Sequence, residues 1–333
     1  MANVIIGIHG LGNKPPRQLL EHWWELAMIE GLKANNFDIL FPKFEMVYWA
    51  DVLYDKALSK SEKDINSPWY LIERYVKASK DFPYENHETR EKIVDYLGHQ
   101  LNKVFLNDDL SLNYSFITDT IVHRYFKDLE AYYAESLNVG KDKVCKAKDL
   151  IRKRLLEVLE KYKDDNIMLV SHSMGSIVAF DVLKFNTPHI NINTFITMGS
   201  PLGLPVVITK IAAEQKQIYT DGMQMATPAA VLKNWYNFAD ILDKVAFYFK
   251  LADDFSENLH GIKPIDFLVV NNYETEEIRN PHKSFGYLRT PEFSKVLHEF
   301  IATEQLTHFQ IFIRKIKHVF NPLIHVLHLK EQK

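Results

Sequence analysis

The sequence predicts an α/β protein built on a mostly parallel sheet with helices on both faces. Short, apolar, β-branched runs alternate with segments of helical periodicity along much of the chain. These runs are apolar at nearly every position, which is typical of strands that are buried on both faces. Two of them end directly in glycine, as expected for the tight loops that follow strands in such sheets.

The amino-acid composition excludes several classes of protein. The 333 residues are 47% hydrophobic and 25% charged, which excludes a disordered or collagen-like chain. The 40 basic and 43 acidic side chains leave a formal charge of −3, so the sequence lacks the basic excess of a nucleic-acid-binding protein. The single cysteine, Cys145, cannot form an internal disulfide, which favours a reducing compartment.

The amino-terminal residues and the hydropathy pattern predict the location of the protein. The chain starts with MANVIIGIHG, an apolar run that lacks the basic region of a signal peptide. No stretch of about 18 uninterrupted apolar residues is present, so the sequence predicts no transmembrane helix. We therefore expect a soluble, cytoplasmic protein.

The first 50 residues predict a β-α-β unit. Residues 4–9 form an apolar, β-branched run that a Gly-Leu-Gly turn closes, as expected for a buried strand. A Pro-Pro pair opens a helical pattern, and Gly31 marks its predicted end. Residues 37–49 form a second strand region.

Residues 51–139 differ from the rest of the chain. Glycine is almost absent, aromatic side chains are frequent, and apolar residues recur at the three- and four-residue spacing of helices. We interpret this range as a helical cap or insertion over a main body formed by residues 1–50 and 140–305. Its clearest apolar stripe consists of Ile121, Val122, Tyr125, Phe126, Leu129, Tyr132 and Tyr133.

The main body then continues the alternation of elements. An amphipathic helix is predicted over residues 144–162, with lysines on its solvated face. The further predicted elements are strands at 166–170, 192–198, 233–239 and 265–270, and helices at 174–186 and 292–301.

The most informative motif is Ser171-His172-Ser173-Met174-Gly175, which joins an apolar strand directly to an apolar helix. A serine at so sharp a turn has a strained backbone, which small residues two positions before and after it allow. Ser171 and Gly175 are such residues. The turn would place the Ser173 hydroxyl at the carboxyl edge of the sheet, beside the positive end of the following helix.

This motif resembles the nucleophile elbow of the α/β-hydrolase superfamily, as found in many lipases and esterases, with Ser171 where glycine is commoner. The resemblance implies the α/β-hydrolase fold and Ser173 as nucleophile, followed along the chain by an acid and then a histidine. A serine requires this histidine because its hydroxyl is a weak nucleophile until a base removes the proton. The alternative is a turn serine that only caps the next helix.

Two aspartates are candidates for the acid. Asp240 directly follows the predicted strand at 233–239, where the superfamily has its acid, and is preferred. Asp243, one helical turn further on, is the alternative. The predicted base is His282, in a loop of turn-forming residues after the strand at 265–270, whereas His260 and His298 fit non-catalytic roles better.

The resemblance also implies an oxyanion hole of two backbone N–H groups. Met174, directly after the nucleophile, supplies one, and Leu11, in the loop after the first strand, supplies the other. We interpret His9, Gly10 and Gly12 as residues that support this loop.

The sequence does not support a cofactor or metal site. Residues 7–12 have the order Gly-x-x-Gly-x-Gly, which differs from the Gly-x-Gly-x-x-Gly fingerprint of dinucleotide-binding proteins. No phosphate-binding P-loop, paired cysteines or His-Glu-x-x-His motif is present. We therefore predict neither a cofactor nor a metal ion.

Residues 306–333 are predicted to form a basic, amphipathic carboxyl-terminal helix, in which an apolar stripe lies opposite Arg314, Lys315 and Lys317. Such a helix could dock on the main body, contact an anionic membrane peripherally, or mediate dimerisation.

Together, these motifs predict a serine hydrolase that cleaves a carboxylic ester through an acyl-enzyme on Ser173. The expected substrate is a hydrophobic small molecule or a lipid-like ester, because the insertion is rich in aromatic residues. An acyltransferase that uses the same residues, and a non-catalytic, membrane-associated scaffold with this fold, are the alternatives.

Overall fold

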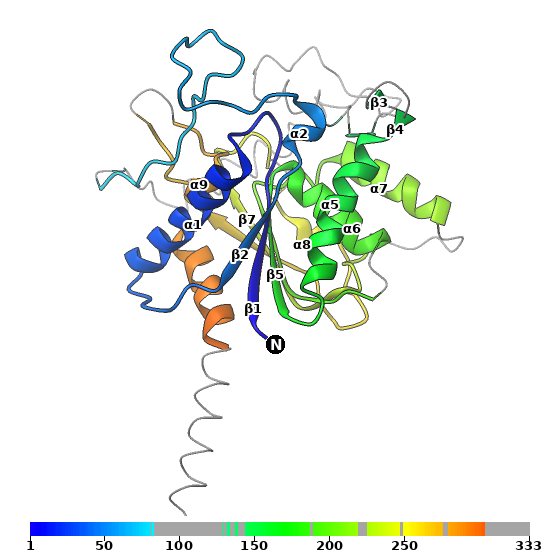
Figure 1. Ribbon diagram of the computed structural model, residues 1–333. Coiled ribbons are helices and arrows are strands. Elements are labelled where there is room, and N and C mark those ends of the chain that lie inside the picture. Colours follow the sequence, from blue (N-terminus) through cyan, green and yellow to red (C-terminus); the bar gives the residue numbers. More distant parts are fainter. Residues whose placement is uncertain are drawn as a thin grey trace, which may run out of the picture.

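A six-stranded sheet forms the centre of the computed structural model (Figure 1). The structure describes residues 1–80, 82, 129, 132–133, 137–138, 144–186, 189–218, 225–246, 249–275 and 279–303. The strand order is β2-β1-β5-β6-β7-β8, and every neighbouring pair is parallel, which confirms the predicted α/β fold. The strands are β1 (Asn3–Ile8), β2 (Lys43–Val47), β5 (Asn166–His172), β6 (Ile192–Met198), β7 (Val231–Asp240) and β8 (Pro264–Val269).

Helices cover both faces of this sheet (Figure 1). The named helices are α1 (Arg17–Ala34), α2 (Ala50–Leu53), α5 (Ala147–Lys161), α6 (Met174–Phe185), α7 (Pro205–Ile218), α8 (Leu251–Asp254) and α9 (Ser284–Tyr287). Residues 291–303 form a further helix, which packs with α1 and α9 on one face. The short strands β3 (Leu137–Asn138) and β4 (Val144–Cys145) form a separate antiparallel pair.

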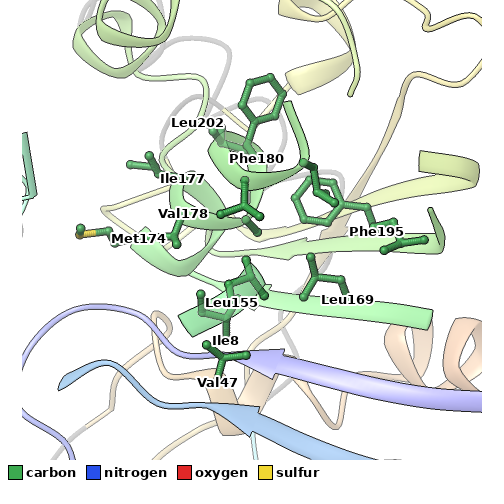
Figure 2. Packing of buried hydrophobic residues seen from close by; sticks show 14 of the residues in the cluster. Ile8, Val47, Leu155, Leu169, Met174, Ile177, Val178, Phe180, Phe195 and Leu202 are labelled. Carbon is green, nitrogen blue, oxygen red and sulfur yellow. The ribbon is translucent and has the colours of Figure 1, made fainter. Parts of the chain in front are cut away.

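The strands are apolar at nearly every position because each face of the sheet has its own core. On the α5–α6 face, Leu155 and Phe180 pack over Ile8 and Leu169, as Figure 2 shows. On the opposite face, residues of intervening strand positions, such as Met168, pack against α1 and the helix at 291–303. Burial of apolar side chains on both faces is the main source of stability for such a sheet.

The chain changes direction across the sheet between β1 and β5. From β1 the chain moves outward to β2, and it later returns to the other side of β1 to form β5. In parallel α/β sheets, ligands bind outside the carboxyl ends of the strands at such a switch point. The loop after β1 and the turn after β5 therefore lie where a site is expected.

Helix α1 does not end at Gly31, as its sequence predicts, but continues to Ala34. Gly31 has a packing role instead. A Cβ atom at this position would lie 2.5 Å from Ser294 Oγ and 2.7 Å from Arg289 Cα, so only glycine lets α1 approach the carboxyl-terminal part of the fold this closely.

The first part of the predicted helical insertion is not helical. After α2, residues 54–80 form turns and extended chain. Short polar side chains stabilise these turns, because Glu62 accepts hydrogen bonds from the backbone of Lys63 and Asp64, and Asp64 accepts one from Asn66. Such bonds compete with helix formation.

Three residues of the predicted aromatic stripe, Leu129, Tyr132 and Tyr133, lie within the described part of the chain. Leu129 and Tyr132 are buried in the core on the α5–α6 face. The remainder of that stripe except Tyr133, and the predicted helix at 306–333, lie outside the described residues. None of the described helices is both long and apolar enough to span a bilayer.

Candidate active site

The turn between β5 and α6 has the strained geometry that its sequence predicts. Ser173 has φ +55° and ψ −132°, an unfavourable conformation for a residue with a side chain. The turn is held by neighbours, because the Ser173 N–H donates to Met198 O at 2.9 Å and the Ser171 hydroxyl donates to Ile196 O at 2.7 Å. A Cβ atom at Gly175 would lie 2.7 Å from two carbonyl oxygens of the β1 end, so a larger residue does not fit there.

Three side chains from separate loops meet at this turn. His282, between β8 and α9, places Nε2 2.9 Å from Ser173 Oγ and Nδ1 2.8 Å from Asp243 Oδ2. An ionised carboxylate only accepts hydrogen bonds, so His282 Nδ1–H is the donor to Asp243. His282 Nε2 then carries the lone pair and accepts the Ser173 hydroxyl proton. This arrangement can activate a serine as a nucleophile.

The carboxylate of Asp240, the preferred acid of the sequence analysis, accepts two backbone hydrogen bonds. Its Oδ1 accepts the N–H of Leu242 at 2.8 Å and its Oδ2 that of Asn271 at 2.6 Å. Asp240 is the last residue of β7, pairs with Val269 in the sheet, and so links the ends of β7 and β8. The aspartate that the structure places against His282 Nδ1 is Asp243, the alternative acid.

A tight turn explains why Asp243 lies against the histidine. The Asp243 N–H donates to Asp240 O at 2.9 Å, which folds the chain back over the strand end. The Asp243 side chain is fully buried, and its Oδ1 accepts the N–H of Val245 at 2.9 Å. Position directly after a strand was the wrong criterion, because the carboxylate that meets the histidine follows the turn.

The sequence analysis did not identify two residues that enclose Asp243. The Tyr287 hydroxyl, on α9, lies 2.6 Å from Asp243 Oδ2. Gly199, at the end of β6, has φ +54°, and a Cβ atom there would lie 2.7 Å from the same oxygen. The glycine that ends the predicted strand at 192–198 was a signal for such a close approach, since the end of that strand faces the same edge of the sheet.

His172, between the elbow residues, was also not identified as a separate site residue. Its Nε2 lies 2.7 Å from the backbone oxygen of His282, and the two rings are 4.8 Å apart. A carbonyl oxygen only accepts, so His172 Nε2–H is the donor. Burial, and then the nearby His282, lower the pKa of His172 well below its usual value, so the ring is neutral and supports the His282 backbone.

The loop after β1 lies directly over the serine. A Cβ atom at Gly10 would be 2.5 Å from Ser173 Cβ, so glycine is required at this point of contact. His9 braces the loop, because its Nε2 accepts the Trp49 N–H at 3.0 Å, which leaves Nδ1–H to donate to Gly10 O at 2.8 Å. Burial and then the charge of Lys14 lower the pKa of His9, so it remains neutral.

This bracing orients the predicted oxyanion donors. The Gly10 oxygen and the Leu11 N–H belong to one peptide group and point to opposite sides of it. Because His9 holds the oxygen, the Leu11 N–H is directed away from His9. Gly12, at φ +76°, turns the chain after it, and Met174 lies at the amino-terminal end of α6.

The segment of residues 71–78 contacts the loop that carries His282. Its Glu73 binds the side-chain amide of Asn280 and pairs with Lys283 at 2.6 Å. The Asn280 side-chain oxygen in turn accepts the His282 N–H at 2.9 Å. Burial would raise the pKa of Glu73, but Lys283 and then Asn280 lower it to about 2. Glu73 is therefore ionised at neutral pH and holds the histidine loop in place.

We expect Glu73→Gln to lower the free energy of unfolding by about 1–3 kcal/mol at pH 7, since it removes a partly buried charged partner of Lys283. The pKa of Glu73 is lower in the folded than in the unfolded protein, where it is near 4.5. Its stabilising effect is therefore complete above pH 4.5 and is lost as the pH falls toward 2. Denaturant unfolding at pH 7, 5 and 3 measures this, and a difference between variant and wild type that stays constant would contradict it.

Within the described residues, no group of three or more histidine, cysteine, aspartate or glutamate side chains is arranged to hold a metal ion.

The parallel sheet, the strained serine elbow and its contacts define a protein of the α/β-hydrolase type. In agreement, residues 92–253 match the family model of the PGAP1-like alpha/beta domain, which is a little under half of the chain. No curated protein matches the chain in sequence.

Among solved structures, the chain is similar to a serine hydrolase involved in carbazole degradation, the CarC enzyme. The match has 13% sequence identity and a TM-score of 0.26, and it covers 50% of this chain and 76% of that one. So distant a match does not bear on function, and the assignment to this class rests on the features described above.

Proposed function

We propose that the protein is a serine hydrolase that cleaves a carboxylic ester through an acyl-enzyme on Ser173. One observation carries the proposal: an unbroken chain of hydrogen bonds from Asp243 through His282 to Ser173, at a turn whose backbone is strained. Strain at a position that the surrounding structure determines this closely is characteristic of a functional site.

The geometry supports the following sequence of steps. His282 Nε2 takes the hydroxyl proton while Ser173 Oγ attacks the ester carbonyl, and the Asp243 carboxylate stabilises the resulting imidazolium. The Leu11 and Met174 N–H groups stabilise the oxyanion. His282 then gives its proton to the departing alcohol, which leaves the acyl group on Ser173. Water, deprotonated by His282, releases the acid and restores the serine.

The proposed substrate has a hydrophobic acyl group. Its support is the composition of residues 51–139, which are rich in aromatic side chains. A series of p-nitrophenyl esters from short to long chain tests this: we expect kcat/KM to rise with chain length, and a preference for acetate would contradict it.

A fluorophosphonate probe tests the nucleophile independently of the substrate. We expect one equivalent of label, on the peptide that contains Ser173, and no label on Ser173→Ala. A wild-type protein that stays unlabelled while folded would support the non-catalytic scaffold instead. Addition of an alcohol or thiol acceptor separates hydrolase from acyltransferase, since only the latter would transfer most of the acyl group to the acceptor.

A further inference from the structure

The hydroxyl of Tyr287 lies between the two aspartates that follow β7. It is 2.9 Å from the backbone N–H of Asp240 and 2.6 Å from Oδ2 of Asp243, and the tyrosine is completely buried. The direction of both hydrogen bonds follows from proton counting. The Asp240 N–H can only donate, so it occupies a lone pair of the phenol oxygen, and the single phenol proton goes to the Asp243 carboxylate.

The Tyr287 hydroxyl keeps its proton at neutral pH and is therefore a donor. Burial, then the charges of Asp243 and Asp240, raise the pKa of its phenol well above the usual value, so it does not ionise. The Asp243 Oδ2 atom therefore accepts two hydrogen bonds at once, one from Tyr287 and one from His282 Nδ1–H. The two donors share the negative charge of one oxygen.

We propose that Tyr287 is a positioning residue that holds the carboxylate of Asp243 and limits its attraction for the His282 imidazolium. This inference rests on the proposed function. The hydrogen bond from the Tyr287 hydroxyl stabilises the negative charge of the Asp243 carboxylate. The stability of this charge then depends less on the His282 imidazolium. The attraction of the Asp243 carboxylate for the imidazolium is consequently weaker than it would be without the phenol.

The other groups around His282 do not duplicate this role. His172 is neutral and donates to the His282 backbone oxygen, and the charge of Lys283 is paired with Glu73. Lys14 donates to carbonyl oxygens of the loop after β1, and its charge acts on His172. Among the described residues, Ser173, Asp243 and His172 contact His282 itself. Lys283, paired with Glu73, is its neighbour in the chain, and Tyr287 reaches it through Asp243.

The Tyr287→Phe variant tests the proposal. It keeps the ring that packs near Gly199 and removes only the hydroxyl. We expect the acidic limb of kcat/KM against pH to move upward by about one unit, and kcat at its optimum to fall about tenfold, because the carboxylate loses a fixed partner. Loss of activity with an unchanged acidic limb would mean that Tyr287 has only a structural role.

Tyr132→Phe is the matched control. Tyr132 is equally buried and its hydroxyl donates to the buried Asp181 at 2.8 Å and accepts from Arg152 at 3.1 Å, away from the triad. Both variants lose the same kind of bond, so they should be destabilised alike in denaturant unfolding. Only Tyr287→Phe should move the pH profile. An equal shift of the pH profile in both variants would mean that general loosening of the structure causes it, which would overturn the proposal.

Titration of the His282 ring by NMR separates this inference from the proposed function. Its signal is assigned by loss in His282→Gln, and no substrate is needed. We expect the midpoint to lie about one unit higher in Tyr287→Phe than in wild type. If no ester is cleaved but the midpoint moves, the proposed function fails and the inference about Tyr287 holds. If esters are cleaved but the midpoint is unchanged, only the inference fails.

Discussion

Replacing Ser173 with alanine is expected to lower kcat for ester hydrolysis at least about 10³-fold. The variant retains the backbone N–H groups and the binding surface but has no atom that can attack the carbonyl, and loss of a triad member has effects of this size or more in serine hydrolases. Initial rates with the best p-nitrophenyl ester of the series measure the loss. Alanine has a Cβ atom, as serine does, so it is under the same backbone strain at the positive φ of position 173. We therefore expect no large change in the fold.

Ser294→Ala is a suitable control for this experiment. Ser294 is also completely buried, and it lies in the helix at 291–303, where its hydroxyl donates to Thr290 O at 2.8 Å. It should lose stability and retain kcat within a factor of two or so, as expected for a residue outside an active site. Equal hydrolysis by Ser173→Ala and wild type would falsify the mechanism.

Asp243→Asn is expected to lower kcat by about 10⁴-fold, the effect of the same change in serine proteases. An amide can donate to His282 Nδ1, which leaves the proton on Nε2. The imidazole is then in the wrong tautomer to accept the proton of Ser173. The histidine and the serine are still present, so the fluorophosphonate reaction should slow without a change in the labelled residue.

Asp240→Asn should have the opposite effects, with a loss of stability and little loss of activity. Its carboxylate accepts two backbone N–H groups at the ends of β7 and β8, and an amide can accept only one of them. We expect a loss of about 1–3 kcal/mol in the free energy of unfolding and less than a tenfold loss in kcat. If instead Asp240→Asn is inactive and Asp243→Asn is active, the role that we propose for Asp243 is wrong.

The comparison of these two aspartates shows what the sequence can and cannot predict. Strand positions follow from apolar runs, so β6 was predicted at its observed bounds and the end of β5 led directly to Ser173. The sequence predicts His282 because it is the one histidine in the loop of turn-forming residues that follows the strand at 265–270. The choice between Asp240 and Asp243 depends on a four-residue turn that folds the chain back, and local patterns do not report which side chain then faces a distant histidine.

Other features could not be predicted because they depend on contacts between distant segments. In the sequence, Tyr287 is an aromatic residue at the end of a predicted loop, and its role depends on the place where the chain after β7 turns. Glu73 lies in a polar stretch that was expected to be helical, and its importance arises from Asn280 and Lys283, more than 200 positions away. Gly31 illustrates the same limit, since a close approach and a helix end have the same signal in sequence.

The distribution of the triad over three loops has a consequence for biosynthesis. Ser173 follows β5, Asp243 follows β7, and His282 follows β8, the edge strand nearest the carboxyl terminus. A growing polypeptide on the ribosome therefore lacks one of the three proposed residues until β8 and the loop after it have emerged. Under the proposed mechanism, recovery of ester turnover after dilution from denaturant would report the docking of β8 on the sheet.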